Sequence, residues 1–406
     1  MTRKQKSNKC PSSRNRYSVQ AMKIAGALIA LICFFLSLNA VAQQKPPAAL
    51  EPLIENVDKA VTEIVKDPKA GSFTIGVVDK SGLVWSKSYG FSNIEKQVAA
   101  TPDSVYRIGS ITKQVTGLML LQLVQEGKVR LSDPVEKYFP EIHLVPTPYK
   151  GAPPVTLVQL ATHSSGLAPE PDDTATYVKG PVAEWEKTLI AALPHTRYLF
   201  EPGTHCSYSN IGYAILGAAL ARAAHQPFTE YVKEKILRPL GMTHTDFEDT
   251  PAIREKLTRG YDVVFSNGKF DSQTAEKEIL TGRGYKVPNG ALFTTVADLA
   301  HFELFEMLGG PDSVLPRKDV EGNRHNLVCA DPEMNVGYGI GFHAQRVAGH
   351  LLLGHAGGVI GYTAMAFFDP DSQLGLILLR NETAFGNEKV LQAFAERLPE
   401  KKSKAD

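Results

Sequence analysis

The spacing of apolar residues changes along the chain from a strand-like pattern to a helical one and back again. Residues 73–91 form two runs rich in β-branched and aromatic side chains, separated by the polar turn 79–82, and this pattern predicts a β-hairpin. Helical spacing dominates from Ser110 to about Ala224. Strand-like runs return late in the chain, at residues 336–347, 361–370 and 374–380.

Strands near both ends of the chain, with helices between them, predict one antiparallel sheet whose strands come from both termini. We therefore expect an α/β fold of the α+β type, in which helices flank the antiparallel sheet and a helical lobe is inserted at roughly 125–290. The expected domain is a single two-lobed unit over residues 61–400. A linker and the start of the first helix precede it at 43–60, and residues 401–406 form a tail.

Basic residues and a long apolar run mark the first 42 residues as a separate segment. Seven Lys and Arg side chains precede residue 24, and no acidic side chain occurs before Glu51. The apolar run 24–42 ends in Ala-Val-Ala, the small-residue pattern at which signal peptides are cleaved. Residues 1–42 are therefore predicted to be a secretory signal peptide, and the mature protein is expected in the periplasm or outside the cell.

Alternatives for this leader stay open. The apolar run is nearly long enough to span a bilayer, so the segment can also be an uncleaved membrane anchor. A leader that is poor in acidic residues and rich in Ser and Arg also fits an organellar transit peptide. Met22 alone opens a signal of ordinary length, so either Met1 or Met22 can be the start of translation.

Composition and charge argue against nucleic acid as a partner, and they leave open whether two cysteines form a disulfide. The chain has 406 residues, of which 43% are hydrophobic and 21% charged, and its net charge is +1. Loss of the seven basic residues of the leader leaves the mature chain at −6, so it has no electrostatic basis for binding nucleic acid. Its two remaining cysteines, Cys206 and Cys329, either form one disulfide or stay as two buried thiols.

Ser110 and Lys113 stand three residues apart at the start of an apolar helical run that stops near Gly127. On a helix this spacing puts both side chains on one face, with Cβ atoms about 5–6 Å apart. A serine hydroxyl becomes a good nucleophile when a base takes its proton, and burial favours the neutral lysine that can be this base. The free N–H groups of the helix N-terminus can also stabilise an oxyanion at Ser110.

The same spacing occurs at Ser266 and Lys269, where the two residues bracket an Asn-Gly turn in a polar stretch. That second pair is predicted to flank a hairpin turn and to have no chemistry. Spacing alone therefore does not identify a catalytic pair. Taken by itself, Lys113 fits a surface lysine on an amphipathic helix equally well.

Two further motifs supply polar groups that such a pair needs. Tyr208 and Asn210 precede an apolar helix: a phenol can shuttle a proton if nearby positive charge lowers its pKa, and Asn can hold both Lys113 and a substrate amide. His355 and Gly357 lead into a strand, where His can donate to a substrate carbonyl or carboxylate and Gly allows close backbone approach. Each motif alone also fits an ordinary loop. No His-x-x-x-His pair or closely spaced Cys pair occurs, so no metal or other cofactor is predicted.

In this order and context the three motifs resemble those of the serine β-lactamase-like hydrolases, which are related to class C β-lactamases and DD-peptidases. The resemblance extends from about residue 71 to residue 381. It includes seven collinear segments: SVYRIGSITK, LVQLATHSSGL, FEPGTHCSYSNIGYAILG, PLGM, NGALFTTVADLAHF, YGIGF and GHAGGVIGY. Seven such matches are far more specific than any single motif.

The resemblance implies an acyl-enzyme mechanism without a metal, in a site enclosed between a helical lobe and an α/β lobe. Ser110 would attack a substrate carbonyl. Lys113 and Tyr208 would handle its proton and later activate the deacylating water. The oxyanion would lie between the backbone N–H groups of Ser110 and Gly358. The substrate would be a small molecule or a peptide.

The third motif departs from the Lys-Thr-Gly of β-lactamases and DD-peptidases, in which Lys and Thr help to bind a substrate carboxylate. Here Ala356 cannot hydrogen-bond through its side chain, and a neutral His355 is not a fixed cation. The His-x-Gly version is common among the family's esterases, amidases and D-amino-acid-specific peptidases. We therefore expect an exported serine hydrolase that acts on esters or on amide or peptide bonds. The alternatives are a β-lactamase or D-alanyl-D-alanine carboxypeptidase, and a non-catalytic protein that binds cell-wall fragments or a partner.

Overall fold

The computed structural model describes seven segments of the chain, which are residues 46–67, 70–266, 269–274, 282–324, 327–331, 336–383 and 386–400. The chain divides into two units, Met1–Lys45 and Pro46–Asp406, and only the second contains described residues. The predicted signal peptide and the predicted tail at 401–406 therefore lie outside the described residues. Within the described segments, no helix is both long and apolar enough to cross a membrane.

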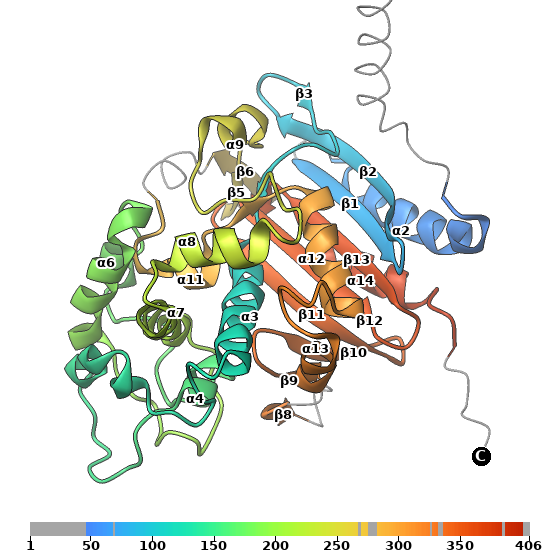
Figure 1. The fold of residues 1–406 in the computed structure, drawn as a ribbon. Coiled ribbons are helices and arrows are strands. Elements are labelled where there is room, and N and C mark those ends of the chain that lie inside the picture. The colour runs from blue at the N-terminus through green and yellow to red at the C-terminus, as the bar shows by residue number, and fades with distance from the viewer. Residues whose placement is uncertain are drawn as a thin grey trace, which may run out of the picture. The chain divides into compact units, whose positions relative to one another are not determined.

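In the described part of the second unit, nine strands form one antiparallel sheet in the order β3-β2-β1-β13-β12-β11-β10-β9-β8 (Figure 1). Phe73 of β1 lies opposite Arg380 of β13, and Val78 lies opposite Gly375. Strands from both ends of the chain thus meet in one sheet, as the pattern predicted. The strands are β1 (Ser72–Asp79), β2 (Gly82–Asn93), β3 (Val98–Ala99), β8 (Cys329–Asp331), β9 (Val336–Tyr338), β10 (His343–Val347), β11 (His350–Val359), β12 (Tyr362–Asp369) and β13 (Leu374–Arg380).

Helices cover both faces of the sheet. Helices α2 (Glu51–Ile64) and α14 (Asn387–Ala395) pack together on one face, and α12 (Val296–Leu308) packs on the other (Figure 1). Alternate residues of β1, such as Phe73 and Ile75, enter the core shared with α2 and α14. Because both faces are covered, β1 is buried along almost its whole length.

The middle of the chain is mainly helical and packs beside the sheet. Helices α3 (Thr112–Gln125) and α7 (Asn210–Ala224) pack against each other, and nearly all of their side chains are buried, so neither helix presents a whole face to solvent. The shorter helices are α4 (Leu157–Ala161), α5 (Thr174–Tyr177), α6 (Trp185–Ala192), α8 (Phe228–Val232), α9 (Pro251–Lys256), α11 (Val287–Gly290) and α13 (Arg317–Arg324).

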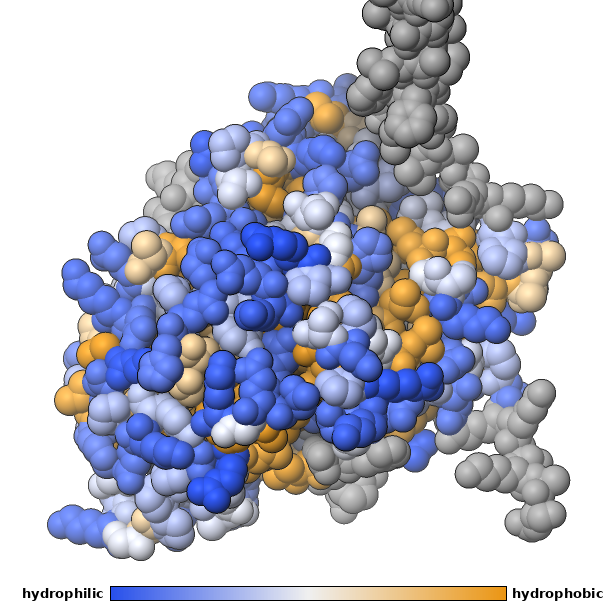
Figure 2. All heavy atoms as spheres, in the orientation of Figure 1, coloured by the Kyte–Doolittle hydropathy of each residue, from blue (hydrophilic) through white to orange (hydrophobic). Residues whose placement is uncertain are grey.

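The face of the molecule in Figure 2 is mainly hydrophilic, with smaller groups of hydrophobic residues between the hydrophilic ones.

Both predicted hairpins are confirmed. β1 and β2 pair across the turn at 79–82. β5 (Tyr261–Ser266) and β6 (Lys269–Thr274) also pair antiparallel, with Ser266 opposite Lys269, so this second Ser-x-x-Lys sequence lies at a hairpin end. Strand β5 also pairs in parallel with β14 (Glu382–Thr383).

Two other local features differ from the sequence prediction or complete it. The prediction has His355 and Gly357 leading into a strand, but both lie inside β11, because its pairing with β12 continues through them to Val359. Cys206 and Cys329 form a disulfide, which settles the question that their number left open.

Candidate active site

Ser110 lies in the 3-10 turn η2 (Gly109–Ile111), which leads directly into α3. The turn passes close to β11: a Cβ atom built on Gly109, whose φ is +51°, would lie 2.8 Å from the backbone nitrogen of Gly358. Glycine is required here both for the left-handed φ and for the close approach of the two backbones. Ser110 is therefore held where the helical region meets the sheet.

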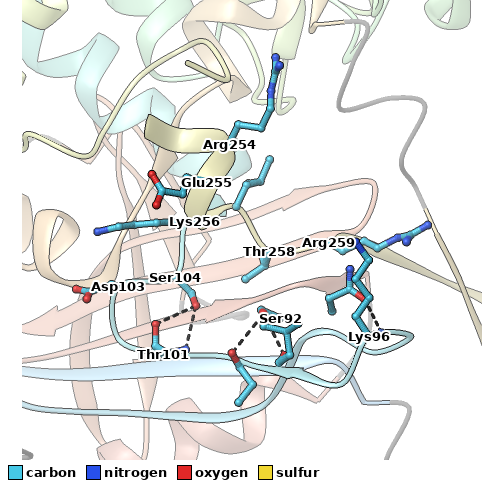
Figure 3. A pocket seen from close by; sticks show the side chains of 14 residues that line it. Ser92, Lys96, Thr101, Asp103, Ser104, Arg254, Glu255, Lys256, Thr258 and Arg259 are labelled. Carbon is cyan, nitrogen blue, oxygen red and sulfur yellow. Dashed lines mark hydrogen bonds between the residues drawn. The ribbon is translucent and has the colours of Figure 1, made fainter. Parts of the chain in front are cut away.

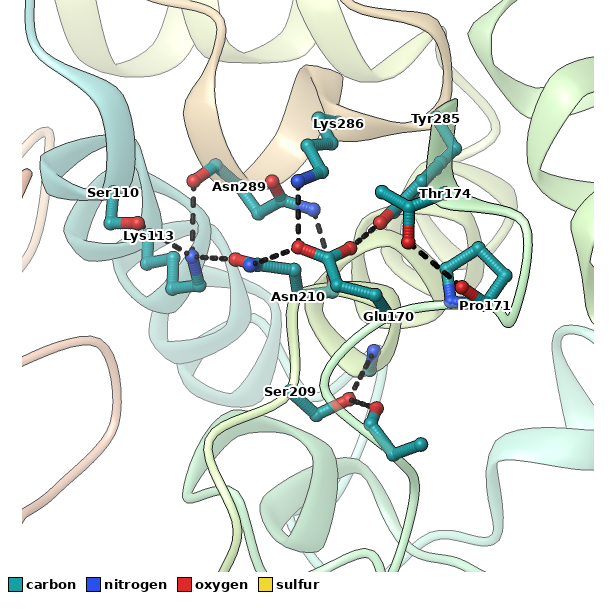
Figure 4. A network of polar contacts seen from close by, with 12 residues as sticks. Ser110, Lys113, Glu170, Pro171, Thr174, Ser209, Asn210, Tyr285, Lys286 and Asn289 are labelled. Carbon is teal, nitrogen blue, oxygen red and sulfur yellow. Dashed lines mark hydrogen bonds and ion pairs between the residues drawn. The ribbon is translucent and has the colours of Figure 1, made fainter. Parts of the chain in front are cut away.

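The Nζ atom of Lys113 contacts three oxygen atoms (Figure 4). It lies 3.1 Å from Ser110 Oγ, 2.7 Å from Asn210 Oδ1 and 3.1 Å from the backbone oxygen of Asn289. Lys113 is 0% exposed, and this burial is the main reason why its pKa lies well below the usual value of 10.5. The lysine is therefore prepared to exist as a neutral amine.

These contacts fix the direction of that amine. A neutral lysine amine has two N–H bonds and one lone pair. The side-chain oxygen of Asn210 and the backbone oxygen of Asn289 can only accept, so both N–H bonds point to them. The lone pair then points to the third neighbour, the hydroxyl of Ser110. Lys113 is thus in position to take the proton of Ser110.

Asn210 is itself held by Glu170, a residue that the sequence motifs do not identify (Figure 4). Asn210 Nδ2 donates to Glu170 Oε1 at 2.8 Å. The same carboxylate accepts hydrogen bonds from Lys286 Nζ, at 2.6 Å, and from the hydroxyl of Tyr285. Glu170 lies 40 residues from Asn210 and 116 from Lys286 in the sequence, so no local spacing marks the group.

Tyr208 lies in the loop before α7 and next to the serine. Interaction with Ser110 lowers the pKa of its hydroxyl, and Lys113 Nζ lies 4.7 Å from the centre of its ring. The motif predicts a proton shuttle if nearby positive charge lowers the pKa of Tyr208, but burial raises that pKa, because loss of hydration outweighs the interaction with Ser110. Tyr208 is therefore a neutral phenol that can donate a proton.

The loop that carries Tyr208 is held on both sides. The Cys206–Cys329 disulfide ties it to β8, and the Ser209 hydroxyl caps the N-terminus of α7. The backbone N–H of Ser209 donates to Nδ1 of His163 at 3.0 Å, and the His163 ring lies 4.3 Å from that of Tyr208. His163 is 3% exposed and was not among the predicted site residues, although it lies within the LATHSSGL segment.

His355 is buried within the sheet, with 2% of its surface exposed. Its Nε2 lies 3.0 Å from the hydroxyl of Tyr338, and its Nδ1 contacts the backbone oxygen of Ala356. Because that oxygen can only accept, Nδ1 carries the proton and Nε2 accepts from Tyr338. Burial also holds the pKa of His355 well below its usual value. The neutral ring therefore has no N–H left for a substrate.

Gly357 and Gly358 bring β11 against the serine turn. A Cβ atom built on Gly357 would lie 1.9 Å from the carbonyl oxygen of Ile108 and 3.1 Å from the backbone nitrogen of Ser110, so only glycine fits. Gly358 is exposed, and among the described residues no atom beyond its chain neighbours lies within 4 Å of a Cβ built on it. The backbone N–H groups of Ser110 and Gly358 thus belong to adjoining segments, beside open space.

The described residues offer few alternatives to this site. Within them, no three His, Cys, Asp or Glu side chains are grouped so that they could hold a metal ion. A cavity of about 560 Å³ lies between the β2–β3 region and the C-terminal end of α9 with the residues that follow it (Figure 3). Its lining contains none of the residues around Ser110; the charged side chains that line it are Lys96, Asp103, Arg254, Glu255, Lys256 and Arg259.

Comparison with known proteins assigns the chain to a family. A profile of the Beta-lactamase family matches residues 57–398, a range that includes all three motifs. The chain belongs to the beta-lactamase family. This agrees with the resemblance seen in the motifs, and the mixed α/β structure has the β-lactamase and penicillin-binding-protein fold of its solved relatives.

The chain is similar to several named proteins, of which three follow. Beta-lactamase-like protein 2 of Dictyostelium discoideum is 33% identical over 298 residues, which are 70% of this chain and 52% of that protein. AmpH of Escherichia coli strain K12, named a D-alanyl-D-alanine-carboxypeptidase/endopeptidase, is 35% identical over 232 residues, 57% of this chain and 59% of that protein. The crystal structure of a D-stereospecific amidohydrolase from Streptomyces matches with a TM-score of 0.67 and 26% identity, over 84% of this chain and 97% of that one. The chain thus spans between half and three fifths of the length of the first two relatives.

Proposed function

We propose that this protein is a serine hydrolase that forms an acyl-enzyme on Ser110 and cleaves esters or amide and peptide bonds. The observation that carries the proposal is the geometry of Lys113, whose Nζ has two neighbouring oxygens that can only accept and a third neighbour, the Ser110 hydroxyl, 3.1 Å away. A buried neutral lysine in this arrangement is a base directed at one hydroxyl.

Acylation follows from the same groups. Ser110 Oγ attacks the carbonyl carbon while its proton passes to Lys113 Nζ, and the carbonyl electron pair moves to oxygen. The N–H groups of Ser110 and Gly358 stabilise that oxyanion. When the tetrahedral species collapses, the bond to the leaving nitrogen or oxygen breaks. Tyr208 gives its proton to the leaving group and regains one from the Lys113 ammonium.

Deacylation reverses these roles. A water molecule gives a proton to Lys113 Nζ and attacks the acyl carbon. The Ser110 oxygen then leaves and takes a proton back from the Lys113 ammonium. Every group in these reaction steps belongs to the protein, the substrate or water, so the proposal requires no metal.

The environment of His355 supports the proposal that the substrate needs no carboxylate beside strand β11. The buried neutral ring has both nitrogens engaged, and the side chain of Ala356 cannot hydrogen-bond. Strand β11 therefore supplies no fixed cation there. The names of the Streptomyces amidohydrolase and of AmpH support a D-configured amide as one substrate class.

A panel of chromogenic substrates tests the proposal. The protein is incubated with a short-chain ester, a D-amino-acid anilide and a cephalosporin, next to the Ser110→Ala variant. We expect hydrolysis of the ester or the anilide, and a loss of about a thousandfold or more in Ser110→Ala. Acylation by a covalent inhibitor that persists in Ser110→Ala would remove Ser110 as the nucleophile.

A β-lactamase or D-alanyl-D-alanine carboxypeptidase activity is the second candidate, and the identity with AmpH favours it. Fast hydrolysis of the cephalosporin would select this candidate and show that the third motif does not decide the substrate. Turnover of none of the three substrates, by the wild type or by Ser110→Ala, would favour a non-catalytic binding module of the family.

We also propose that the protein is exported after cleavage behind Ala42. The basic and apolar pattern of residues 1–42 supports this proposal. Intact-mass measurement of the protein made in a secreting host is expected to give a chain that begins at Gln43. A mass that retains the leader would favour an anchored form.

A further inference from the structure

Glu170 lies beyond Asn210 as seen from Lys113, in the loop between α4 and α5 (Figure 4). We propose that Glu170 is a positioning residue for the reaction: it fixes the orientation of Asn210 and, together with Lys286, controls how readily Lys113 takes the proton of Ser110. This inference rests on the proposed function, because it gives Glu170 a part in activating the serine.

The orientation of Asn210 follows from what its neighbours can donate and accept. An asparagine side chain has one accepting oxygen and one donating NH₂ group at nearly the same place, so its neighbours decide which way it faces. The Glu170 carboxylate can only accept, and it lies 2.8 Å from Asn210 Nδ2. The oxygen of Asn210 must then face Lys113, at 2.7 Å. If the amide turned over, its NH₂ group would compete with Ser110 for the lysine lone pair.

The same carboxylate also holds the other side of the site. The lysine and tyrosine that bind Glu170 lie in η8 (Gly284–Lys286), directly before α11, which carries Asn289. Asn289 Nδ2 donates to the backbone oxygen of Asn210 at 2.8 Å, and its own backbone oxygen accepts from Lys113. Glu170 therefore joins the two segments whose oxygens surround the amine.

Charge gives Glu170 a second effect on Lys113. After burial, which is the largest cause, the charges of Lys286 and Arg283 lower the pKa of Lys113, and the charge of Glu170 raises it. The Glu170 and Lys286 side chains are only 26% and 15% exposed, so solvent screens them weakly. The other titratable groups around the lysine are held in their neutral forms by burial: Tyr208, Tyr213, Tyr338, His163, His343 and His355.

The pH dependence of kcat/KM tests the charge effect, because activity on the acid side is lost when Lys113 becomes protonated. Glu170→Gln removes the negative charge and keeps the size, so the acid limb is expected to move to lower pH by about one unit. Lys286→Met removes the positive charge and keeps most of the length, so the acid limb is expected to move about as far to higher pH. A residue with a merely structural role would not produce opposite shifts.

A further variant, Glu170→Ala, tests whether Glu170 fixes the orientation of Asn210. Glu170→Gln keeps an oxygen that can accept from Asn210, whereas Glu170→Ala removes it. We expect the plateau of kcat/KM in Glu170→Ala to fall about tenfold below that of Glu170→Gln, because Asn210 is then free to turn. The matched control is Glu141→Gln, which removes a 29% exposed carboxylate paired with Arg222 of α7. Thermal unfolding of each variant shows whether it is folded.

Three results would overturn the proposal. They are acid limbs that stay at the wild-type pH in both charge variants, limbs that move in the same direction, and a plateau in Glu170→Ala equal to that of Glu141→Gln. If one variant does not fold, the shift of the other still decides the direction of the charge effect.

Labelling by a fluorophosphonate separates this proposal from the proposed function. The reagent needs only an activated Ser110, so the pH dependence of its labelling rate reports on Lys113 without any substrate. If the full-length protein is labelled at Ser110 but hydrolyses no ester or amide, the proposed function fails, and the labelling profiles of the Glu170 and Lys286 variants still test the proposal. No labelling of Ser110 in the wild-type protein would overturn both.

Discussion

Lys113 is fully buried and has a lowered pKa, so it is expected to couple both the stability and the proposed activity to pH. Because its pKa is lower in the folded than in the unfolded chain, folding stability rises as pH increases from the folded pKa towards about 10.5, by up to about 1.4 kcal/mol per pH unit. We predict that Lys113→Met loses this rise and lowers kcat/KM by about a thousandfold. Urea unfolding at about pH 7 and about pH 9, for both proteins, measures the difference. Parallel stability changes in the two proteins would contradict the prediction.

Glu303 on α12 is predicted to have the opposite dependence on pH. It is 2% exposed, and burial raises its pKa well above the usual 4.5. Its stabilising effect is complete below pH 4.5 and is lost as pH rises towards the folded pKa, because the unfolded chain then loses its proton more readily. Glu303→Gln keeps the shape and removes the titration. In urea unfolding between about pH 5 and about pH 8, the variant is expected to gain stability relative to the wild type. A constant difference would show that Glu303 does not titrate.

Individual site residues were predictable from the sequence where a local pattern marked them. Ser110 and Lys113 share one helical turn within an apolar run, so their proximity followed from spacing. Glu170 and His163 had no such pattern, because each meets its partners only after the segment between α4 and α7 has packed. The pKa of Tyr208 was equally hidden, since burial is a property of the folded chain and not of the motif.

At the scale of elements, the Cys206–Cys329 disulfide connects the loop of the predicted catalytic tyrosine to β8 at the edge of the sheet. The bond closes a loop of 123 residues, so its removal is expected to lower the free energy of unfolding by about 2–5 kcal/mol. Tyr208 lies two residues after Cys206, so we also predict a fall in kcat.

The double variant Cys206→Ser/Cys329→Ser, measured by urea unfolding and by turnover, tests this prediction. Treatment with a reductant is the control, since it should reproduce the effect in the wild-type protein and leave the double variant unchanged. An unchanged kcat in the reduced protein would show that Ser209 and His163 hold the loop without the disulfide.

At the scale of the whole molecule, the fold depends on contacts between the two ends of the described chain. The strand patterns predicted this arrangement, because strands at both ends can bury their apolar residues together in one shared sheet. The order of the nine strands and the pairing of α2 with α14 were not predictable, since several orders satisfy the same pattern. The register of β1 against β13 and the packing of α2 on α14 show that the two ends are direct neighbours.

This arrangement predicts that α14 is essential for folding even though it lies far from Ser110 in the sequence. Its large buried apolar side chains, Val390, Leu391 and Phe394, pack on the face of the sheet that α2 also covers. Exposing these three side chains would cost about 1.5–3 kcal/mol each, which together equals much of the net stability of a typical domain. We predict that a chain ending at residue 386 fails to show a cooperative thermal transition by circular dichroism, whereas a chain ending at residue 400 unfolds like the wild type. A cooperative transition in the shorter chain would mean that α2 and the sheet suffice, and that the C-terminal helix only covers a core that is already stable.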